Sequence, residues 1–171
     1  MDICTVILED HAEQRGAFAI LDEVDPRDAE KLGPLWNRLA VLLEVHAEAE
    51  EKLFYPRLLE VGTGASDADS ASDETEDAIH DHNEIRDAVR EVSRHEVASD
   101  DWWKAVTAAR EANSDHMAEE EREALADFRR HADLRTRHEI GLAFRVYEAQ
   151  HYQGITPEDH DPKAWVAEHG G

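Results

Sequence analysis

Apolar residues in this 171-residue chain recur every three or four positions, and charged residues fill the positions between them. This spacing is typical of amphipathic helices, whereas few segments alternate as strands do. The pattern predicts four long helices at about 3–23, 34–60, 76–96 and 101–129, and a fifth at about 132–151. Because most connections are short, we predict an all-α fold, an up-and-down antiparallel four-helix bundle with an additional C-terminal helix.

Glycine, proline and small polar residues interrupt the helical pattern in three places. Asp25-Pro26 and Gly33-Pro34 separate the first two predicted helices. Residues 62–75 are small, polar and acidic, so we expect a mobile surface loop that buries nothing. The pattern is also weak near the C-terminus. We therefore assign residues 1–151 to the bundle and residues 152–171 to a C-terminal tail.

The apolar side of each of the first four predicted helices also carries a histidine. At steps of three or four residues, four histidines and two glutamates fall on these inward faces: His11, His46, Glu50, His82, His116 and Glu120. A buried polar group without a partner costs roughly 1–3 kcal/mol, and a charged group costs more. Their placement on buried faces therefore predicts that these six side chains share a binding partner.

The two halves of the sequence resemble each other. Residues 10–17 (DHAEQRGA) match residues 81–88 (DHNEIRDA) at an offset of 71, and residues 46–51 (HAEAEE) match residues 116–121 (HMAEEE) at an offset of 70. Two matches at nearly one offset indicate an internally duplicated helical hairpin, packed about a pseudo-two-fold axis. Each half then contributes one histidine from its first helix and a His-x-x-x-Glu pair from its second.

The third predicted helix contains another His-x-x-x-Glu pair, formed by His80 and Glu84. At 100° per residue, His82 lies about 200° away from His80, on the apolar stripe. We therefore predict that His82 points inward and His80 lies on the solvated face. The other histidines show no such phasing and are expected at the surface: His95, His131, His138, His151, His160 and His169.

The inward residues have the chemistry of metal ligands. Histidine and glutamate four residues apart lie one turn apart on the same helix face, close enough to bind one metal or two adjacent metals. Imidazole and carboxylate together suit iron, manganese or zinc. Six residues give three ligands to each of two metals, with Glu50 and Glu120 placed to bridge. Such a site is under-coordinated, so water, an oxo group, O₂ or peroxide can occupy its open positions.

A histidine or a His-x-x-x-Glu pair taken alone is more often structural than a ligand. A helical interaction protein with structural histidines is therefore one alternative, and it predicts a stability indifferent to iron. We favour metal because the same residue types recur in phase in both halves. Tyr55, nine residues after His46, could face the site, but we expect it to serve core packing.

The chain is strongly acidic, with 41 Asp+Glu against 18 Lys+Arg and a formal net charge of −23. This charge disfavours nucleic acid and anionic membranes as partners, since both need basic patches. The one cysteine, Cys4, excludes an internal disulfide framework and a multi-cysteine metal site. No apolar run approaches the roughly 20 residues that span a bilayer, and we identify no export signal, so we expect a cytoplasmic protein.

Together these segments resemble the hemerythrin-like, or HHE cation-binding, family. The resemblance covers about residues 5–130 and rests on four segments: 10–11 (DH), 46–56 (HAEAEEKLFYP), 81–86 (DHNEIR) and 116–121 (HMAEEE). It implies an up-and-down four-helix bundle around a non-haem di-iron centre. The ligands it implies are His11, His46, His82 and His116, with Glu50 and Glu120 as carboxylate bridges. Two iron ions are therefore expected ahead of manganese or zinc.

The sequence departs from the oxygen-carrying hemerythrins in two places. Those proteins have two histidines one turn apart on the third helix, whereas Ala78 and Arg86 flank His82 at that spacing. They also place a carboxylate five residues after the fourth-helix histidine. Here Glu120 and Glu121 follow His116 at four and five residues, and the repeat favours Glu120. Both departures disfavour a dedicated reversible O₂ carrier.

Members of the family bind, sense or store oxygen, sense iron, or turn over peroxide and nitrogen oxides. We expect a non-haem di-iron protein that binds O₂ or a related small oxidant, in binding, sensing or storage. The alternative is a di-iron enzyme that reduces or disproportionates peroxide or nitrogen oxides. Ferritin-like bundles rank second for architecture, because their Glu-x-x-His pattern differs from the His-x-x-x-Glu pattern here.

Overall fold

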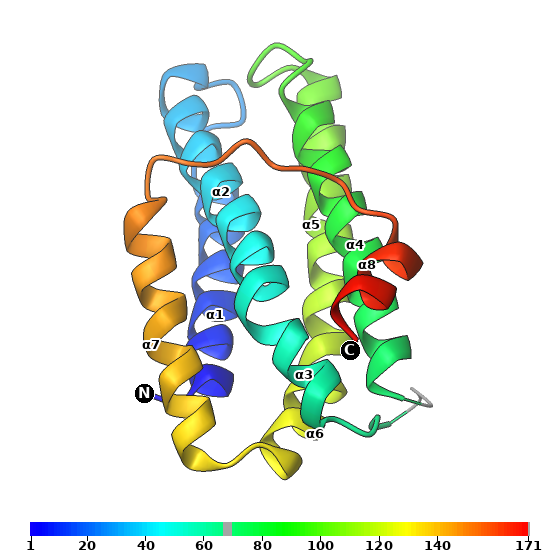
Figure 1. Cartoon of the computed structure of the whole chain (residues 1–171). Coiled ribbons are helices and arrows are strands. Elements are labelled where there is room, and N and C mark those ends of the chain that lie inside the picture. Colours follow the sequence, from blue (N-terminus) through cyan, green and yellow to red (C-terminus); the bar gives the residue numbers. More distant parts are fainter. Residues whose placement is uncertain (67–69, 171) are drawn as a thin grey trace.

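The computed structural model describes residues 1–66 and 70–170, and this part of the chain contains helices and no strands. Two antiparallel helical hairpins lie side by side (Figure 1). The first pairs α1 (Ile3–Asp22) with α2 (Ala29–Ala49), and the second pairs α4 (Ala71–Val92) with α5 (Asp100–Arg122). The predicted all-α, up-and-down four-helix bundle is confirmed.

After its second helix, each hairpin continues through an irregular turn into a further short helix. In the first, the π-helix η1 (Glu50–Phe54) joins α2 to α3 (Tyr55–Val61). The N–H of Tyr55 bonds to the carbonyl of Glu50, five residues back. Pro56 follows, and its ring would clash with a carbonyl four residues back in a regular helix, which explains the wider turn. In the second, α5 breaks at Glu123 before α6 (Ala124–His131).

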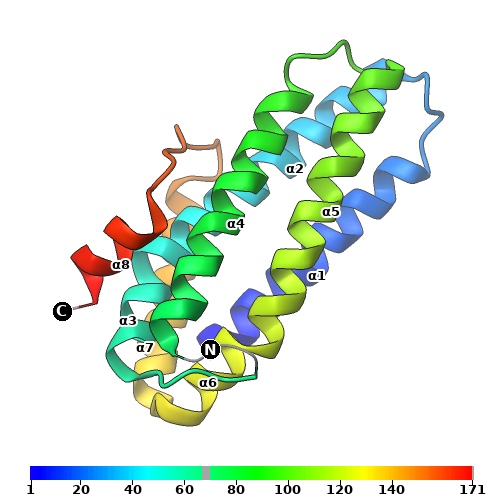
Figure 2. The same cartoon turned by 90° about the vertical axis from the view of Figure 1, so that its right-hand side faces the viewer.

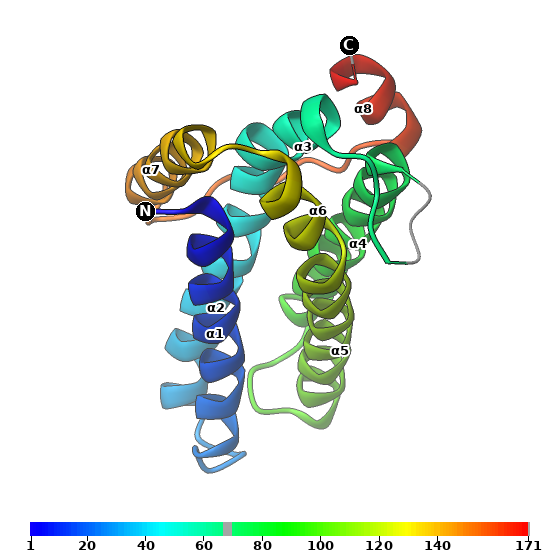
Figure 3. The ribbon, with the colours of Figure 1, turned by 90° about the horizontal axis from the view of Figure 1, so that it is seen from below.

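The remaining helices cover the outside of the bundle. The predicted fifth helix is α7 (Leu134–Gln150), which packs along α1 and α2. The chain then crosses the bundle to α8 (Pro162–His169), which packs against α4 (Figures 1 and 3). Asp161 caps α8 by accepting the N–H of Ala164, and the helix buries Trp165. The C-terminal tail therefore contains a short packed helix that its weak sequence pattern did not predict.

The second helix starts earlier than predicted. It begins at Ala29 rather than near residue 34, because the side chain of Asp28 accepts the N–H of Lys31 and caps the new start. The predicted break at Gly33-Pro34 is wrong, since Pro34 lies inside α2.

The third predicted helix, α4, also starts earlier than predicted, at Ala71 rather than near residue 76. Ser70 accepts the N–H of Asp73, and two acidic residues occupy the first turn, where they suit the helix dipole. The predicted loop at 62–75 is therefore wrong over residues 71–75, where Ala71 and Thr75 are buried. Residues 67–69 of that predicted loop lie outside the described residues.

The apolar core has two parts with a polar layer between them. Phe18 and Trp36 belong to the part near the α1–α2 turn, and Ile7 and Phe54 belong to the part near α3 and α6. Along α1, His11 lies between Ile7 and Phe18, so apolar side chains cover the polar layer from both ends. None of the described helices is long and apolar enough to cross a membrane.

Candidate metal centre

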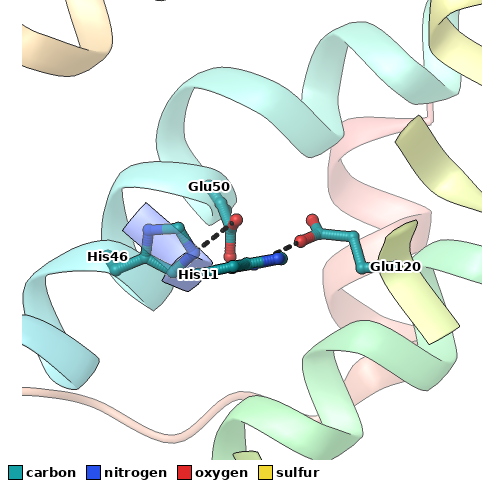
Figure 4. A group of neighbouring side chains, drawn as sticks. All are labelled: His11, His46, Glu50 and Glu120. Atoms are coloured by element: carbon teal, nitrogen blue, oxygen red, sulfur yellow. Dashed lines mark ion pairs between the residues drawn. The ribbon is translucent and has the colours of Figure 1, made fainter. Parts of the chain in front are cut away.

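The polar layer brings all six predicted ligands together, in two overlapping clusters. The first cluster consists of His11, His46, Glu50 and Glu120, all buried, with one donor atom each within 4.8 Å of the others (Figure 4). His46 Nε2 lies 2.8 Å from Glu50 Oε1. His11 Nε2 lies 3.2 Å from Glu120 Oε2. Residues from α1, α2, η1 and α5 thus converge on one point.

The second cluster consists of Glu50, His82 and His116, which are also buried. His82 Nε2 lies 3.2 Å from Glu50 Oε2 and 3.2 Å from His116 Nε2. Glu50 therefore belongs to both clusters, with one oxygen toward each. Glu120 groups with the first cluster alone, and its bridging role stays a prediction.

The donor atoms fit cations better than they fit one another. Five of them are buried and have no hydrogen-bond partner among the described residues: His11 Nε2, His46 Nε2, Glu50 Oε1, Glu50 Oε2 and Glu120 Oε2. Several of these atoms lie close together without the geometry of a hydrogen bond. Unsatisfied buried donors and acceptors are costly. Imidazole nitrogens and carboxylate oxygens are suitable ligands for first-row transition metals, so these groups could hold two metal ions.

Each histidine also has a carboxylate at its outer nitrogen, Nδ1. Glu121 lies 2.9 Å from His11, and Glu51 lies 2.8 Å from His82. Within each hairpin, an aspartate of the first helix faces the histidine of the second helix. Asp10 lies 3.4 Å from His46 Nδ1, and Asp81 lies 3.5 Å from His116 Nδ1. At His11 and His82 the contact with the carboxylate is a hydrogen bond, which fixes the ring so that Nε2 faces the centre.

The outer carboxylates follow the internal repeat but cross between the halves. Glu121 of the second hairpin holds His11 of the first, and Glu51 of the first holds His82 of the second. Glu51 and Glu121 occupy equivalent positions at the offset of 70. The sequence contained this signal, because both follow the predicted ligand directly, but a helical phase alone does not place them on the partner hairpin.

An arginine supports the outer glutamate in each half. Arg15 lies 2.8 Å from Glu121 and Arg86 lies 2.7 Å from Glu51, and these arginines are equivalent at the offset of 71. Burial opposes ionisation of Glu51, but its bonds with His82 and Arg86 outweigh burial and lower its pKa. Arg86 thus helps to keep Glu51 charged at the outer side of His82.

Tyr55 touches the centre, although core packing was expected to be its role. Its hydroxyl donates to Glu120 Oε1 at 2.7 Å, and its ring packs 5.8 Å from the ring of His82. Burial and the nearby charges of Glu120 and Glu50 raise the pKa of Tyr55 well above its usual value, so the hydroxyl keeps its proton. Tyr55 therefore both packs in the core and holds one oxygen of Glu120.

The histidines outside the centre lie mostly where predicted. The His80 side chain is 63% exposed and pairs with Glu84 at 3.3 Å, whereas His82 is fully buried, as predicted. His160 differs, because its Nε2 lies 3.5 Å from Glu51 Oε2. The segment before α8 therefore reaches the carboxylate that holds His82.

A third group of possible donors comprises Asp10, His46 and Glu148. Arg145 of α7 forms ion pairs with both Asp10 and Glu148. The guanidinium already neutralises these carboxylates, so this group has less need of a cation than the two buried clusters.

Comparison with known proteins identifies the family. The family model described as the Hemerythrin HHE cation binding domain matches residues 2–128, which include all six predicted ligands. Searches of the curated proteins and of the solved structures found no match to the chain. The match covers well over half of the sequence, so the chain belongs to the hemerythrin HHE cation-binding family.

Proposed function

We propose that the chain holds two iron ions in this centre and uses them to bind O₂ or a related small oxidant. The position of Glu50 between the two clusters is the main support for this proposal. Its Oε1 lies 2.8 Å from His46 in the first cluster, and its Oε2 lies 3.2 Å from His82 in the second. A buried carboxylate within reach of both clusters could serve two adjacent cations of a shared centre.

The donor set supports iron. Four imidazoles and two carboxylates form a mixed nitrogen and oxygen environment, which iron accepts readily. The family model is that of a cation-binding domain. Manganese and zinc accept the same donors, so metal analysis of the purified protein distinguishes the three.

The two clusters differ in how many positions they leave open. The first has four protein residues and the second has three, so a metal ion held by His82 and His116 would have more open positions for a small ligand. A cavity of about 20 Å³ touches His116 and Glu120, which is room for about one water molecule. When bound there, a pair of ferrous ions supplies electrons to the oxidant.

The protein residues set the geometry around this open position. Tyr55 keeps its proton and donates to Glu120, so that this carboxylate holds one orientation. Glu51 fixes the ring of His82. The two apolar parts of the core cover the centre from above and below and so limit the access of water.

Anaerobic loading with ferrous iron tests the proposal. We expect about two irons per chain and a visible absorption change when O₂ is admitted. The variant Glu50→Gln should hold fewer than two irons, whereas Glu48→Gln, two residues earlier on α2, should still hold two. Fewer than two irons in the unmodified protein, with no spectral response to O₂, would contradict the proposal.

Hydrogen peroxide added to the same samples tests the enzymatic alternative. Catalytic O₂ release that disappears in His46→Ala would show that the centre turns over peroxide. Release unchanged in that variant would be background iron chemistry and would remove this alternative.

A further inference from the structure

A small cavity between α4 and α5 is lined both by residues of the metal centre and by exposed residues of the two helices. The two helices lie side by side on one face of the bundle (Figure 2). The cavity touches His116 at its inner end, and six of its lining residues are carboxylates: Glu74, Asp77, Asp81, Glu119, Glu120 and Glu123. No lysine or arginine lines it among the residues that the structure describes. We call this feature the acidic cavity.

The carboxylates of the acidic cavity range from exposed to buried. Asp77 and Glu119 are exposed, Asp81 and Glu123 are half-buried, and Glu74 is buried. The cavity therefore has carboxylates at different depths, and it is also lined by the buried His116.

Glu74 provides an independent sign of a ligand. It is only 4% exposed, and its Oε1 accepts the N–H of Ala65 at 2.7 Å. Its Oε2 is buried and has no hydrogen-bond partner in the described part of the chain. Burial and the nearby carboxylates of Asp127, Glu123 and Asp73 raise the pKa of Glu74 to about 7. A buried carboxylate with a free oxygen on a cavity is costly unless a cation or a proton accompanies it.

The internal repeat shows that four of the six acidic residues are specific to one half. At the offsets of 71 and 70, the first half has apolar residues where the second has Glu74, Asp77, Glu119 and Glu123: Ile3, Val6, Ala49 and Leu53. The first three of these are fully buried, and α7 packs over α1 and α2. Asp81 and Glu120 do have acidic counterparts, which are Asp10, paired with Arg145, and the predicted ligand Glu50.

The two halves therefore differ at these equivalent positions. Helix α7 covers the apolar residues of the first half, whereas the acidic residues of the second half line a cavity. Packing alone explains the apolar residues under α7, but it does not explain carboxylates at the equivalent positions of a cavity that ends at His116. We propose that the acidic cavity is the entry route and a transient binding site for the divalent cation that loads the metal centre. This inference rests on the proposed function.

The charge of the acidic cavity supplies the physical basis. A cleft lined by charges of one sign concentrates the field and can raise the association rate of an oppositely charged ligand by 10-fold or more. The same field is screened at high salt. Imidazole suits iron, whereas carboxylate and water suit harder cations, so iron in the cavity would gain a better ligand on reaching His116.

The rate of cation uptake tests this proposal with a matched pair of variants. The double variant Asp77→Asn/Glu119→Gln removes two charges from the mouth of the acidic cavity. The control Asp87→Asn/Glu111→Gln removes the same charges from exposed positions on the same two helices, away from the cavity. Apo protein is mixed with Co²⁺, and the visible absorption of bound cobalt is followed by stopped flow.

We expect the cavity variant to take up Co²⁺ about 10-fold more slowly than the control at low salt. The difference should shrink at high salt, and the final cobalt content should be equal in all proteins. Equal rates in the cavity variant and the control would overturn the proposal, because charge at the cavity would then have no special effect. No uptake by the unmodified protein would instead refute the metal centre, and the entry route with it.

Discussion

Replacing His82 by alanine should destabilise the fold far more than the same replacement of His80. His82 is fully buried, with Nδ1 2.8 Å from Glu51 and Nε2 3.2 Å from Glu50. Removing one partner of a buried ion pair leaves the other charge uncompensated and typically costs about 3–5 kcal/mol, so the free energy of unfolding should fall by about that amount. His80 is exposed and has one helical pair with Glu84, worth about 0.3–0.5 kcal/mol.

Urea unfolding followed by circular dichroism measures both variants, without metal and after iron loading. In the absence of metal the two should already differ by about 3 kcal/mol or more. Iron should raise the stability of the His80→Ala protein more than that of the His82→Ala protein, since a ligand that binds only the folded state stabilises it. Equal costs for the two substitutions, with no response to iron, would refute the reasoning and favour structural histidines.

Three further outcomes are expected. Burial and nearby carboxylates raise the pKa of Glu74 to about 7 from 4.5, so its stabilising contribution is complete below pH 4.5 and is lost as the pH rises through 7. Between pH 5 and pH 8, the free energy of unfolding of Glu74→Gln should therefore rise by up to about 3 kcal/mol relative to that of the unmodified protein. Curves of unfolding free energy against pH that run parallel for the two proteins would contradict this. Tyr55→Phe leaves a buried oxygen of Glu120 without its donor and should cost about 1–3 kcal/mol in urea unfolding while iron content stays at two per chain; loss of iron would show that the phenol is a ligand. The net charge of −23 should make the melting temperature rise with added salt, and a melting temperature that does not change with salt would exclude self-repulsion as a significant term.

Helical phase and the internal repeat predicted which side chains come together in the polar layer, because both follow from simple geometry. Residues that share a stripe on a helix must face the same neighbour. This is why His82 could be told from His80, although both begin a similar motif. The repeat then related Glu50 to Glu120 without any knowledge of how the hairpins pack.

The outer carboxylates were less predictable because they depend on how the two hairpins dock. Glu51 and Glu121 directly follow the predicted ligands, and their partners His82 and His11 lie on the opposite hairpin. Nothing in the spacing along one helix shows such a contact. Tyr55 was assigned to the core for a similar reason, since burial and a hydrogen bond to Glu120 are compatible.

Element boundaries were the least predictable part of the fold. A capping side chain decides where a helix starts, and both Asp28 and Ser70 start helices inside segments whose composition suggests a turn or loop. The π-helix at Glu50 and the packed helix α8 likewise depend on tertiary contacts, which composition does not reveal.

Anomalous diffraction from crystals of the iron-loaded protein tests the central claim most directly, because it locates each metal against the side chains around it. We predict two iron peaks, one on either side of Glu50. The first should lie among His11, His46 and Glu120, and the second between His82 and His116. No peak in this layer, or iron bound only at surface carboxylates, would contradict the account.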